Sequence, residues 1–224
     1  MSMLSNLELI RRVPLFALLT SAQAESVAGA VVKRRFKRGE VIVEQGDKSN
    51  MLFIILTGRA RVITSDKRGR EVILATLQPG DYIGEMSLID NQAHSATVRA
   101  EVQTDMLCLG RAEFARCLPE NSSMAYAIMK GLVQRLRQAD RKIESLALMD
   151  VYGRVARALL EFAAPDREGM LSIRERISRQ DIAKMVGASR EMVSRVMKDL
   201  EDRGFIETRE DGSMLIKDRL STLG

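Results

Sequence analysis

Glycine spacing in the first half of the chain is the feature that most limits how it can fold. Between residues 31 and 110, five of the glycines recur every 7 to 12 residues; they are Gly39, Gly46, Gly58, Gly69 and Gly80. Short apolar runs stand between them, at 41–43, 52–56, 72–77 and 106–109. Glycine adopts the positive φ angles of tight turns, and short strands at this spacing are typical of an all-β sandwich or barrel. The pattern predicts a β-domain.

The pattern changes to helical spacing from residue 121 to residue 149, where there is no Pro and only Gly131. Apolar residues recur at steps of 4, 4, 3, 4 and 3; they are Ile128, Leu132, Leu136, Ala139, Ile143 and Leu146. A helix over this range would be about 40 Å long. It either packs on its own β-domain or forms the seam of a homodimer. The homodimer is favoured, because a β-domain alone rarely needs so long a helix and twofold dimers are the commonest oligomers.

The last third of the chain predicts helices followed by a hairpin. Asp150 can cap a helix that runs to about residue 163, where 164–166 stop it. Two short strands are predicted at 205–208 and 214–216, because Asp211 and Gly212 between them are a strong hairpin signal.

Residues 178–206 predict a helix-turn-helix. Ser178 can cap the first helix, Gly187 suits the left-handed position of the turn, and Ser189 can cap the second helix. The second helix has an apolar face formed by Met192, Val193, Val196, Met197 and Leu200.

The polar face of that second helix predicts sequence-specific binding to double-stranded DNA. It carries Arg190, Glu191, Ser194, Arg195 and Lys198, near the helix N-terminus that enters a major groove. Arginine forks match the edge of guanine, and glutamate can accept from cytosine. Ser178, Arg179 and Gln180, at the start of the first helix, suit phosphate contacts. Ser189, at the start of the second helix, is also expected to contact DNA. The alternative is an amphipathic hairpin with a solvated charged face.

In this order of segments the chain resembles the Crp/Fnr family of bacterial transcription regulators over nearly its whole length. The resemblance implies an α+β fold. Its parts are a cyclic-nucleotide-binding β-roll (jelly-roll) over 1–118, a dimerisation helix and hinge over 119–150, and a winged helix-turn-helix over 151–224.

The family opens its recognition helix with an Arg-Glu-x-x-x-Arg pattern, which residues 190–195 match. By that resemblance Arg190 and Arg195 would each read a guanine and Glu191 a cytosine. The half-site would be TGTGA-like. The resemblance also implies RNA polymerase as a partner.

Residues 79–100 resemble the family's phosphate-binding cassette. The ligand contacts expected there are Gly84, Glu85, Met86, Ser87, His94, Ser95 and Ala96. A glycine lets backbone approach closely, and N–H groups at a helix N-terminus can face a phosphate. By resemblance, Glu85 would accept from a ribose 2′-hydroxyl and Ser95 would donate to the phosphate. The alternative is a β-roll turn kept for folding.

Two positions depart from the cyclic-AMP-responsive members. Those members place an arginine at the position of His94, and hydroxyl side chains at the positions of Ala139 and Asp140. Histidine lacks the charge and the bidentate fork of arginine, although His94 can equally be a plain loop residue. The Asp140 carboxylate suits guanine N–H donors, and Arg135, Arg137 and Arg141 could meet guanine or phosphate. Asp140 can instead be an ion-pairing helix charge. Cyclic di-GMP is therefore favoured as effector, cyclic AMP comes second, and another ligand or none comes last.

Switching is predicted to be a population shift. A ligand that contacts both Glu85 and Asp140 would bias the packing of the dimer helix, and a hinge at 149–152 would carry that bias to the recognition helices.

Other chemistry finds little support in the residues. An iron–sulfur sensor of the family's type needs N-terminal cysteines, and no Cys precedes Cys108. Cys108 and Cys117 are expected to be inert thiols, and one histidine supports neither a metal site nor a catalytic triad. A nucleotide-processing enzyme using Glu85 would lack a second catalytic group. The chain is predicted to need no cofactor.

Charge and hydropathy favour a cytoplasmic protein without membrane contact. The net charge of +5 is a small steering term for nucleic acid. The longest apolar run is six residues, at 51–56, against the ~18 needed to span a bilayer. Residues 11–24 imitate a signal peptide, but Glu8 and Pro14 argue for a short amphipathic helix instead.

Overall fold

The computed structural model describes residues 5–17, 19–66, 69–120, 122–166, 169–209, 211–217 and 220, without the side chains of 116–120, 122 and 123. Within these ranges the chain forms two compact units, residues 1–136 and 137–224. No helix in the described part is both long enough and apolar enough to cross a bilayer. The short helix predicted at 11–24 is not formed as one helix, because Pro14–Phe16 form a 3-10 turn and a separate helix begins at Ser21. Residue 18 and the side chain of Cys117 lie outside the described residues.

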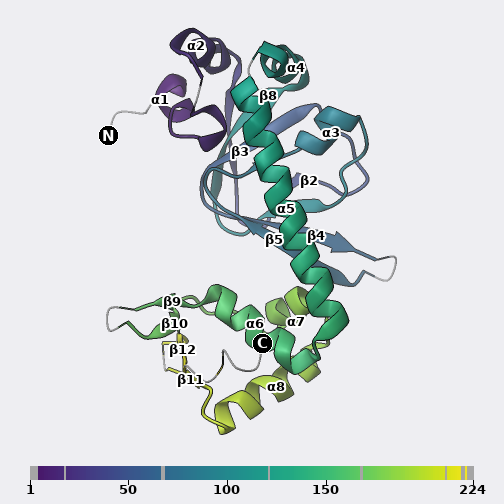
Figure 1. Ribbon diagram of the computed structural model, residues 1–224, viewed down its shortest axis with the longest axis vertical. Coiled ribbons are helices and arrows are strands. Elements are labelled where there is room, and N and C mark those ends of the chain that lie inside the picture. The colour runs from purple at the N-terminus through teal and green to yellow at the C-terminus, as the bar shows by residue number, and fades with distance from the viewer. Residues whose placement is uncertain are drawn as a thin grey trace. The chain divides into compact units, whose positions relative to one another are not determined.

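The first unit is a β-sandwich with helices on one side (Figure 1). Its strands are β1 (Val32–Phe36), β2 (Val41–Val43), β3 (Met51–Thr57), β4 (Ala60–Ser65), β5 (Glu71–Leu77), β6 (Tyr82–Ile83), β7 (Thr97–Ala100) and β8 (Thr104–Gly110). Its helices are α1 (Asn6–Ile10), a 3-10 turn (Pro14–Phe16), α2 (Ser21–Ala30), α3 (Glu85–Asp90), α4 (Arg111–Glu120) and the first part of α5 (Ser122–Leu148). The two antiparallel sheets have the orders β1-β8-β3-β6 and β2-β7-β4-β5.

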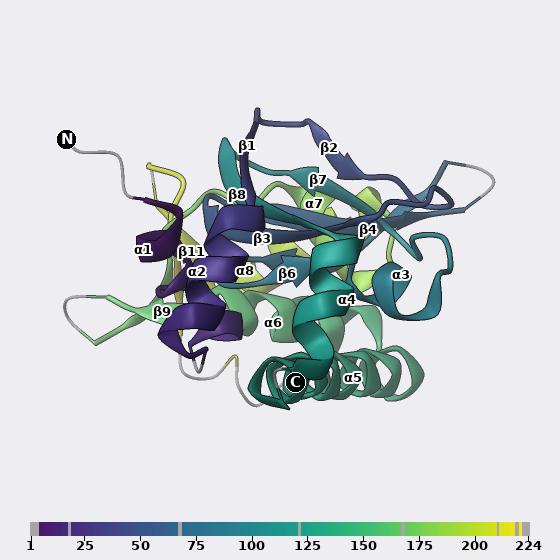
Figure 2. The ribbon, with the colours of Figure 1, turned by 90° about the horizontal axis from the view of Figure 1, so that it is seen from above.

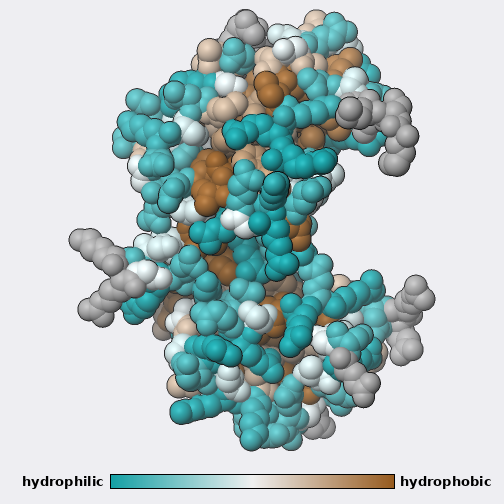
Figure 3. All heavy atoms as spheres, turned by 180° about the vertical axis from the view of Figure 1, so that it is seen from behind, coloured by the Kyte–Doolittle hydropathy of each residue, from teal (hydrophilic) through white to brown (hydrophobic). Residues whose placement is uncertain are grey.

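Strand β3 is buried on both faces, which explains the long apolar run at 51–56. Phe53 and Ile55 point into the cluster between the two sheets. Leu52 and Ile54 point the other way, into a cluster formed with the helices. Figure 2 shows α2, α4 and α5 on the side of the sandwich where this second cluster lies. On the face that Figure 3 shows, hydrophilic residues predominate and hydrophobic residues form separate patches.

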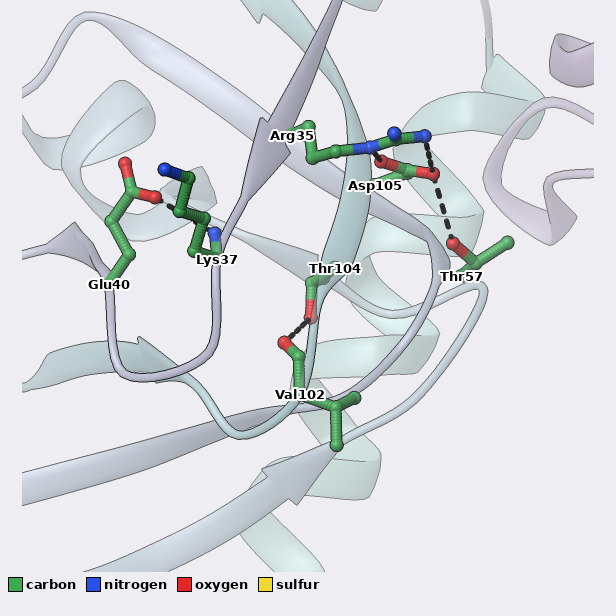
Figure 4. Close-up of polar contacts among 7 residues, drawn as sticks. All are labelled: Arg35, Lys37, Glu40, Thr57, Val102, Thr104 and Asp105. Carbon is green, nitrogen blue, oxygen red and sulfur yellow. Dashed lines mark hydrogen bonds and ion pairs between the residues drawn. The ribbon is translucent and has the colours of Figure 1, made fainter.

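Strand β1 is an edge strand that polar contacts bind to its neighbour β8. Arg35 donates from Nε and Nη2 to the two oxygens of Asp105, at 2.6 and 3.0 Å (Figure 4). Such a bidentate pair fixes geometry better than a single contact does. Thr57, in β3, reaches the same carboxylate at 3.5 Å, so one side chain joins three strands.

The residues of the predicted dimer seam differ in exposure along α5. Ile128, which the spacing placed on the seam, is instead buried against its own sandwich at 3% exposure, and Leu132 packs beside it. The seam residues Leu136, Ala139, Ile143 and Leu146 are exposed. The helical period was correct, but a period alone does not say which neighbour a face meets.

The second unit holds the rest of the chain. After the end of α5 come α6 (Val151–Phe162), β9 (Ala164–Pro165), β10 (Leu171–Ile173), α7 (Arg179–Val186), α8 (Arg190–Asp202), β11 (Ile206–Thr208) and β12 (Met214–Ile216). Asp150 caps α6 by accepting from the N–H of Gly153 at 2.8 Å. The strands form one antiparallel sheet of order β11-β12-β10-β9. The predicted α+β class, with a β-roll before a winged helix-turn-helix, is confirmed.

Candidate ligand pocket and nucleic-acid interface

The cassette in the first unit begins with a forced backbone turn. Gly84 precedes α3 with φ +94°, and a Cβ there would lie 2.5 Å from the carbonyl oxygen of Met51. Only glycine fits this position. The turn places Glu85 at the start of α3, where its side chain is almost completely buried.

Glu85 is paired with a residue on α5. Arg135 Nη1 lies 2.5 Å from Glu85 Oε1, and the same guanidinium donates to the carbonyl oxygen of Tyr82. It also lies over the Tyr82 ring, 5.0 Å from the centroid. Burial raises the pKa of Glu85 above its ordinary value, while the positive charge of Arg135 opposes this rise. The carboxylate that was predicted to accept from a ribose is therefore already paired within the protein. Its partner is Arg135, a residue considered above as a contact for guanine or phosphate.

Tyr82 also fixes where α5 crosses the sandwich. Its hydroxyl donates to the carbonyl oxygen of Ile128 at 3.1 Å. Gly131 makes room for this contact, because a Cβ there would overlap the tyrosine hydroxyl. The lone glycine of α5 thus lies where the Tyr82 hydroxyl contacts the helix.

His94 is a buried, hydrogen-bonded histidine. Its Nδ1 lies 3.2 Å from Ser87 Oγ and its Nε2 lies 2.9 Å from Ser49 Oγ. Its backbone N–H donates to the carbonyl of Asp47 at 2.8 Å. Burial lowers the pKa of His94 below the ordinary value, although Asp47 opposes the shift. The ring is thus neutral at pH 7, with both nitrogens already engaged.

The other predicted ligand residues differ in exposure. Met86 and Ser95 are exposed, whereas Ser87 and Ala96 are buried. The first unit therefore brings the cassette residues 84–87 and 94–96 together, through the Ser87–His94 contact. Asp140 is exposed on α5 and belongs to the second unit.

Arg111 is hydrogen-bonded to the cassette, and no pattern in the sequence predicts this contact. It donates from Nη2 to the carbonyl oxygen of Ser87 at 2.8 Å and from Nε to Asn50 at 3.0 Å. The Ser87 carbonyl also accepts from the N–H of Asn91 at 3.0 Å, so Arg111 is its second donor, and Arg111 Nη1 donates to the carbonyl oxygen of Leu88 at 3.4 Å. An isolated arginine after a strand gives no periodic pattern, so sequence reasoning missed it.

Cys108 fits the prediction of an inert thiol. It is buried between the two sheets, and burial raises its pKa to about 11. A thiol with so high a pKa contains almost no thiolate at neutral pH, and thiolate is the reactive form.

The helix-turn-helix in the second unit has the expected local geometry. Ser178 accepts from the N–H of Asp181 at 3.0 Å, and Ser189 accepts from the N–H of Met192 at 3.2 Å. Gly187 ends α7 with φ +66°. The buried face of α8 consists of Val193, Val196, Met197 and Leu200, whereas Met192 is 41% exposed and lies at its margin.

The predicted DNA contacts form an exposed surface on these two helices. Ser178, Gln180, Ser189, Arg190, Glu191, Ser194, Arg195 and Lys198 are exposed, and Arg179 is half-buried. A hollow of about 620 Å³ lies between the helix starts and the β11–β12 wing. Its charged lining residues are four arginines and two carboxylates: Arg176, Arg179, Arg190, Arg209, Glu175 and Asp211. Clustered arginines near a recognition helix suit the phosphate backbone of DNA.

Comparisons with known proteins match a domain family to each of these two regions. Residues 33–121 match the cyclic nucleotide-binding domain family, and residues 153–220 match the Crp-like helix-turn-helix domain. The cAMP-activated global transcriptional regulator Vfr of Pseudomonas aeruginosa is 37% identical over 186 residues, which cover 79% of this chain and 86% of Vfr. The cyclic AMP receptor protein of Thermus thermophilus is 32% identical over 193 residues, which cover 86% and 88%.

Among solved structures, the c-di-GMP responsive global regulator CLP of Xanthomonas campestris is similar, with 26% identity and a TM-score of 0.75. The likeness covers 88% of this chain and 98% of CLP. Two family models in this order and relatives above 30% identity show the family. The chain belongs to the Crp/Fnr family and is a cyclic-nucleotide-responsive, DNA-binding transcription regulator rather than an enzyme.

Proposed function

We propose that the protein acts as a homodimer whose DNA binding is controlled by cyclic di-GMP. The observation that carries this proposal is the position of Asp140 in an exposed apolar stripe of α5. Met129, Val133, Leu136 and Ile143 are each at least half exposed, and they follow one another at steps of 4, 3 and 7. Asp140 falls in the same spacing, four residues after Leu136.

The stripe has the spacing of a dimer seam. Steps of 3 and 4 keep apolar residues on one line of a helix, which a second copy of the helix can cover. An unpaired aspartate on such a line is costly once it is covered, unless it meets donors. Guanine offers N1–H and N2–H₂ donors to a carboxylate, whereas N1 and N3 of adenine are acceptors.

The cassette supports the same ligand. In this chain the position of the phosphate-binding arginine holds His94, which is neutral and engaged with Ser87 and Ser49. A ligand with a single phosphate therefore finds no charged, bidentate guanidinium at this position. The likeness to CLP, a protein described as c-di-GMP responsive, points the same way.

Cyclic AMP is the second candidate. The specific observation in its favour is the 37% identity to Vfr, which is described as cAMP-activated. Glu85 and Ser95 are also present at the positions where the family binds the ribose and the phosphate.

The proposed DNA target is a palindrome of TGTGA-like half-sites, read by Arg190, Glu191 and Arg195. The DNA-bound dimer would act on RNA polymerase in the cytoplasm.

The test is calorimetric titration of the purified chain with cyclic di-GMP and with cyclic AMP, followed by gel shifts on a TGTGA palindrome with each nucleotide. We expect tighter binding of cyclic di-GMP, and we expect Asp140→Ser to weaken it. The matched control is Glu144→Ser, which removes a carboxylate one turn along the same helix. Tighter binding of cyclic AMP by the unaltered chain, or equal losses in both variants, would overturn the proposed effector.

A further inference from the structure

A carboxylate at the end of the recognition helix joins two parts of the DNA-binding unit. Glu201, in the last turn of α8, accepts a hydrogen bond from the hydroxyl of Thr208 in β11. The same oxygen, Oε1, lies 3.9 Å from Nη2 of Arg179, the first residue of α7. One side chain therefore contacts both the wing and the start of the helix-turn-helix.

Both partners of Glu201 line the arginine-rich hollow. Arg179 and Thr208 are lining residues, together with Arg176, Arg190 and Arg209, and Glu201 is not. Glu201 thus contacts the wall of a site that suits DNA phosphates without facing into it. Its side chain and that of Arg179 are each about one-third exposed, at 35% and 33%.

A carboxylate in this place has two opposite effects on DNA binding. Its negative charge repels phosphates, so a carboxylate that is only a bystander weakens binding. As a partner of Arg179 it restricts the rotamers of the arginine side chain before DNA binds. Less conformational entropy is then lost on binding. The sign of the effect of removing the charge tells these two roles apart.

We propose that Glu201 is a positioning residue for binding of the DNA backbone. It holds Arg179 where its guanidinium meets a phosphate, and it holds β11 beside it through Thr208. This role rests on the DNA-binding function proposed for Arg179, and it is independent of the effector and of the base sequence.

The experiment measures the affinity of the full-length chain for a random-sequence duplex over a series of salt concentrations. Glu201→Gln keeps the size and an acceptor for Thr208 but removes the charge beside Arg179. We expect it to bind about twofold to fivefold more weakly, the range for loss of one partly exposed ion pair. The slope of log K against log salt should fall in magnitude by about 0.9, the value of one phosphate contact.

The matched control is Asp202→Asn, which removes the same charge from the next residue, an exposed one. It should bind DNA as tightly as the unaltered chain or more tightly. If Glu201→Gln also binds more tightly, Glu201 is a bystander and the proposal fails. Thermal unfolding of both variants checks the fold, and a lower affinity with an unchanged salt slope would mark a merely structural effect and also overturn the proposal.

A double variant separates this proposal from the role of Arg179. Arg179→Ala should weaken binding to random DNA, and adding Glu201→Gln should then change nothing more. Additive losses would mean that Glu201 acts through another group and would overturn its assignment. If Arg179→Ala leaves both affinity and salt slope unchanged, the phosphate contact of Arg179 is wrong, and Glu201 loses its role with it.

Discussion

Arg135 on α5 and the buried Glu85 on α3 form an ion pair of 2.5 Å although fifty residues separate them in the chain. The pair attaches α5 to the cassette within one unit. Its environment is asymmetric, because the glutamate side chain is 2% exposed and the arginine side chain 36%. The cost of separating the pair therefore falls mainly on the glutamate.

Arg135→Ala should lower the free energy of unfolding by about 2 kcal/mol at pH 7, because it leaves a buried carboxylate without its partner. Burial already raises the pKa of Glu85. Without Arg135 this pKa rises further, so folding favours the protonated form. The loss should be largest at neutral pH and should shrink as the pH falls toward 4.5, where the unfolded chain also takes up the proton. Urea unfolding at both pH values measures this, and in a Glu85→Gln background the Arg135 substitution should cost much less.

His94 should make the fold sensitive to mild acid. Burial lowers the pKa of His94 below 6.5, so over the range between the two values the unfolded chain binds a proton that the folded chain does not. The stability that His94 contributes is complete above pH 6.5 and is lost as the pH falls through that range. The chain has one histidine, so the difference between it and His94→Gln isolates this effect. Parallel stability curves for the two chains from about pH 7.5 to about pH 5 would contradict it.

Gly131→Ala should destabilise the protein although alanine is the better helix former. A helical glycine costs about 1 kcal/mol relative to alanine, but a Cβ at this position overlaps the Tyr82 hydroxyl. We expect a net loss of about 1–3 kcal/mol in the free energy of unfolding. Gly29→Ala in α2 is the matched control, since nothing lies within 4 Å of a Cβ there, and it should be neutral or stabilising.

The exposed stripe of α5 predicts the effect of a charge at Ile143. Ile143→Asp should dissociate the proposed dimer, costing at least about 3 kcal/mol of association free energy, because two isoleucines lose their burial. Gln138→Asp adds the same charge on another face of the helix and should leave the dimer intact. Sedimentation velocity over a dilution series measures both, and a dimer that tolerates Ile143→Asp would place the interface elsewhere.

Arg190→Ala tests the proposed reading of bases. It should cost about 1–3 kcal/mol on a TGTGA palindrome and relax base choice at one position. Competition gel shifts with single-base variants of the palindrome measure this. An equal loss on the palindrome and on random DNA would reduce Arg190 to a phosphate contact.

The sequence predicted those parts of the fold that depend on local pattern. The caps at Asp150, Ser178 and Ser189 were predicted because they need only neighbouring residues. Strand β1 was missed, because four of its five residues are exposed and its position depends on pairing with β8 rather than on alternating hydropathy.

The side-chain partners of the cassette residues could not be predicted from the sequence for a similar reason. The pairing of Glu85 with Arg135 depends on how α5 crosses the sandwich, and the contact of His94 with Ser49 spans 45 residues. No spacing rule connects such positions. The departure at His94 and its lack of charge were predicted from the sequence, but its burial and its contacts with Ser87 and Ser49 were not.

The contact of Tyr82 with α5 limits how that helix can move. The hydroxyl sits against the one residue of α5 without a side chain, and it is hydrogen-bonded to the carbonyl of Ile128 one turn earlier. If α5 slid along its axis by even one residue, about 1.5 Å, the ring would meet neighbouring side chains. A tilt about this contact keeps the hydrogen bond. The place where Tyr82 meets Gly131 therefore restricts sliding of α5 along its axis more than it restricts tilting about the contact.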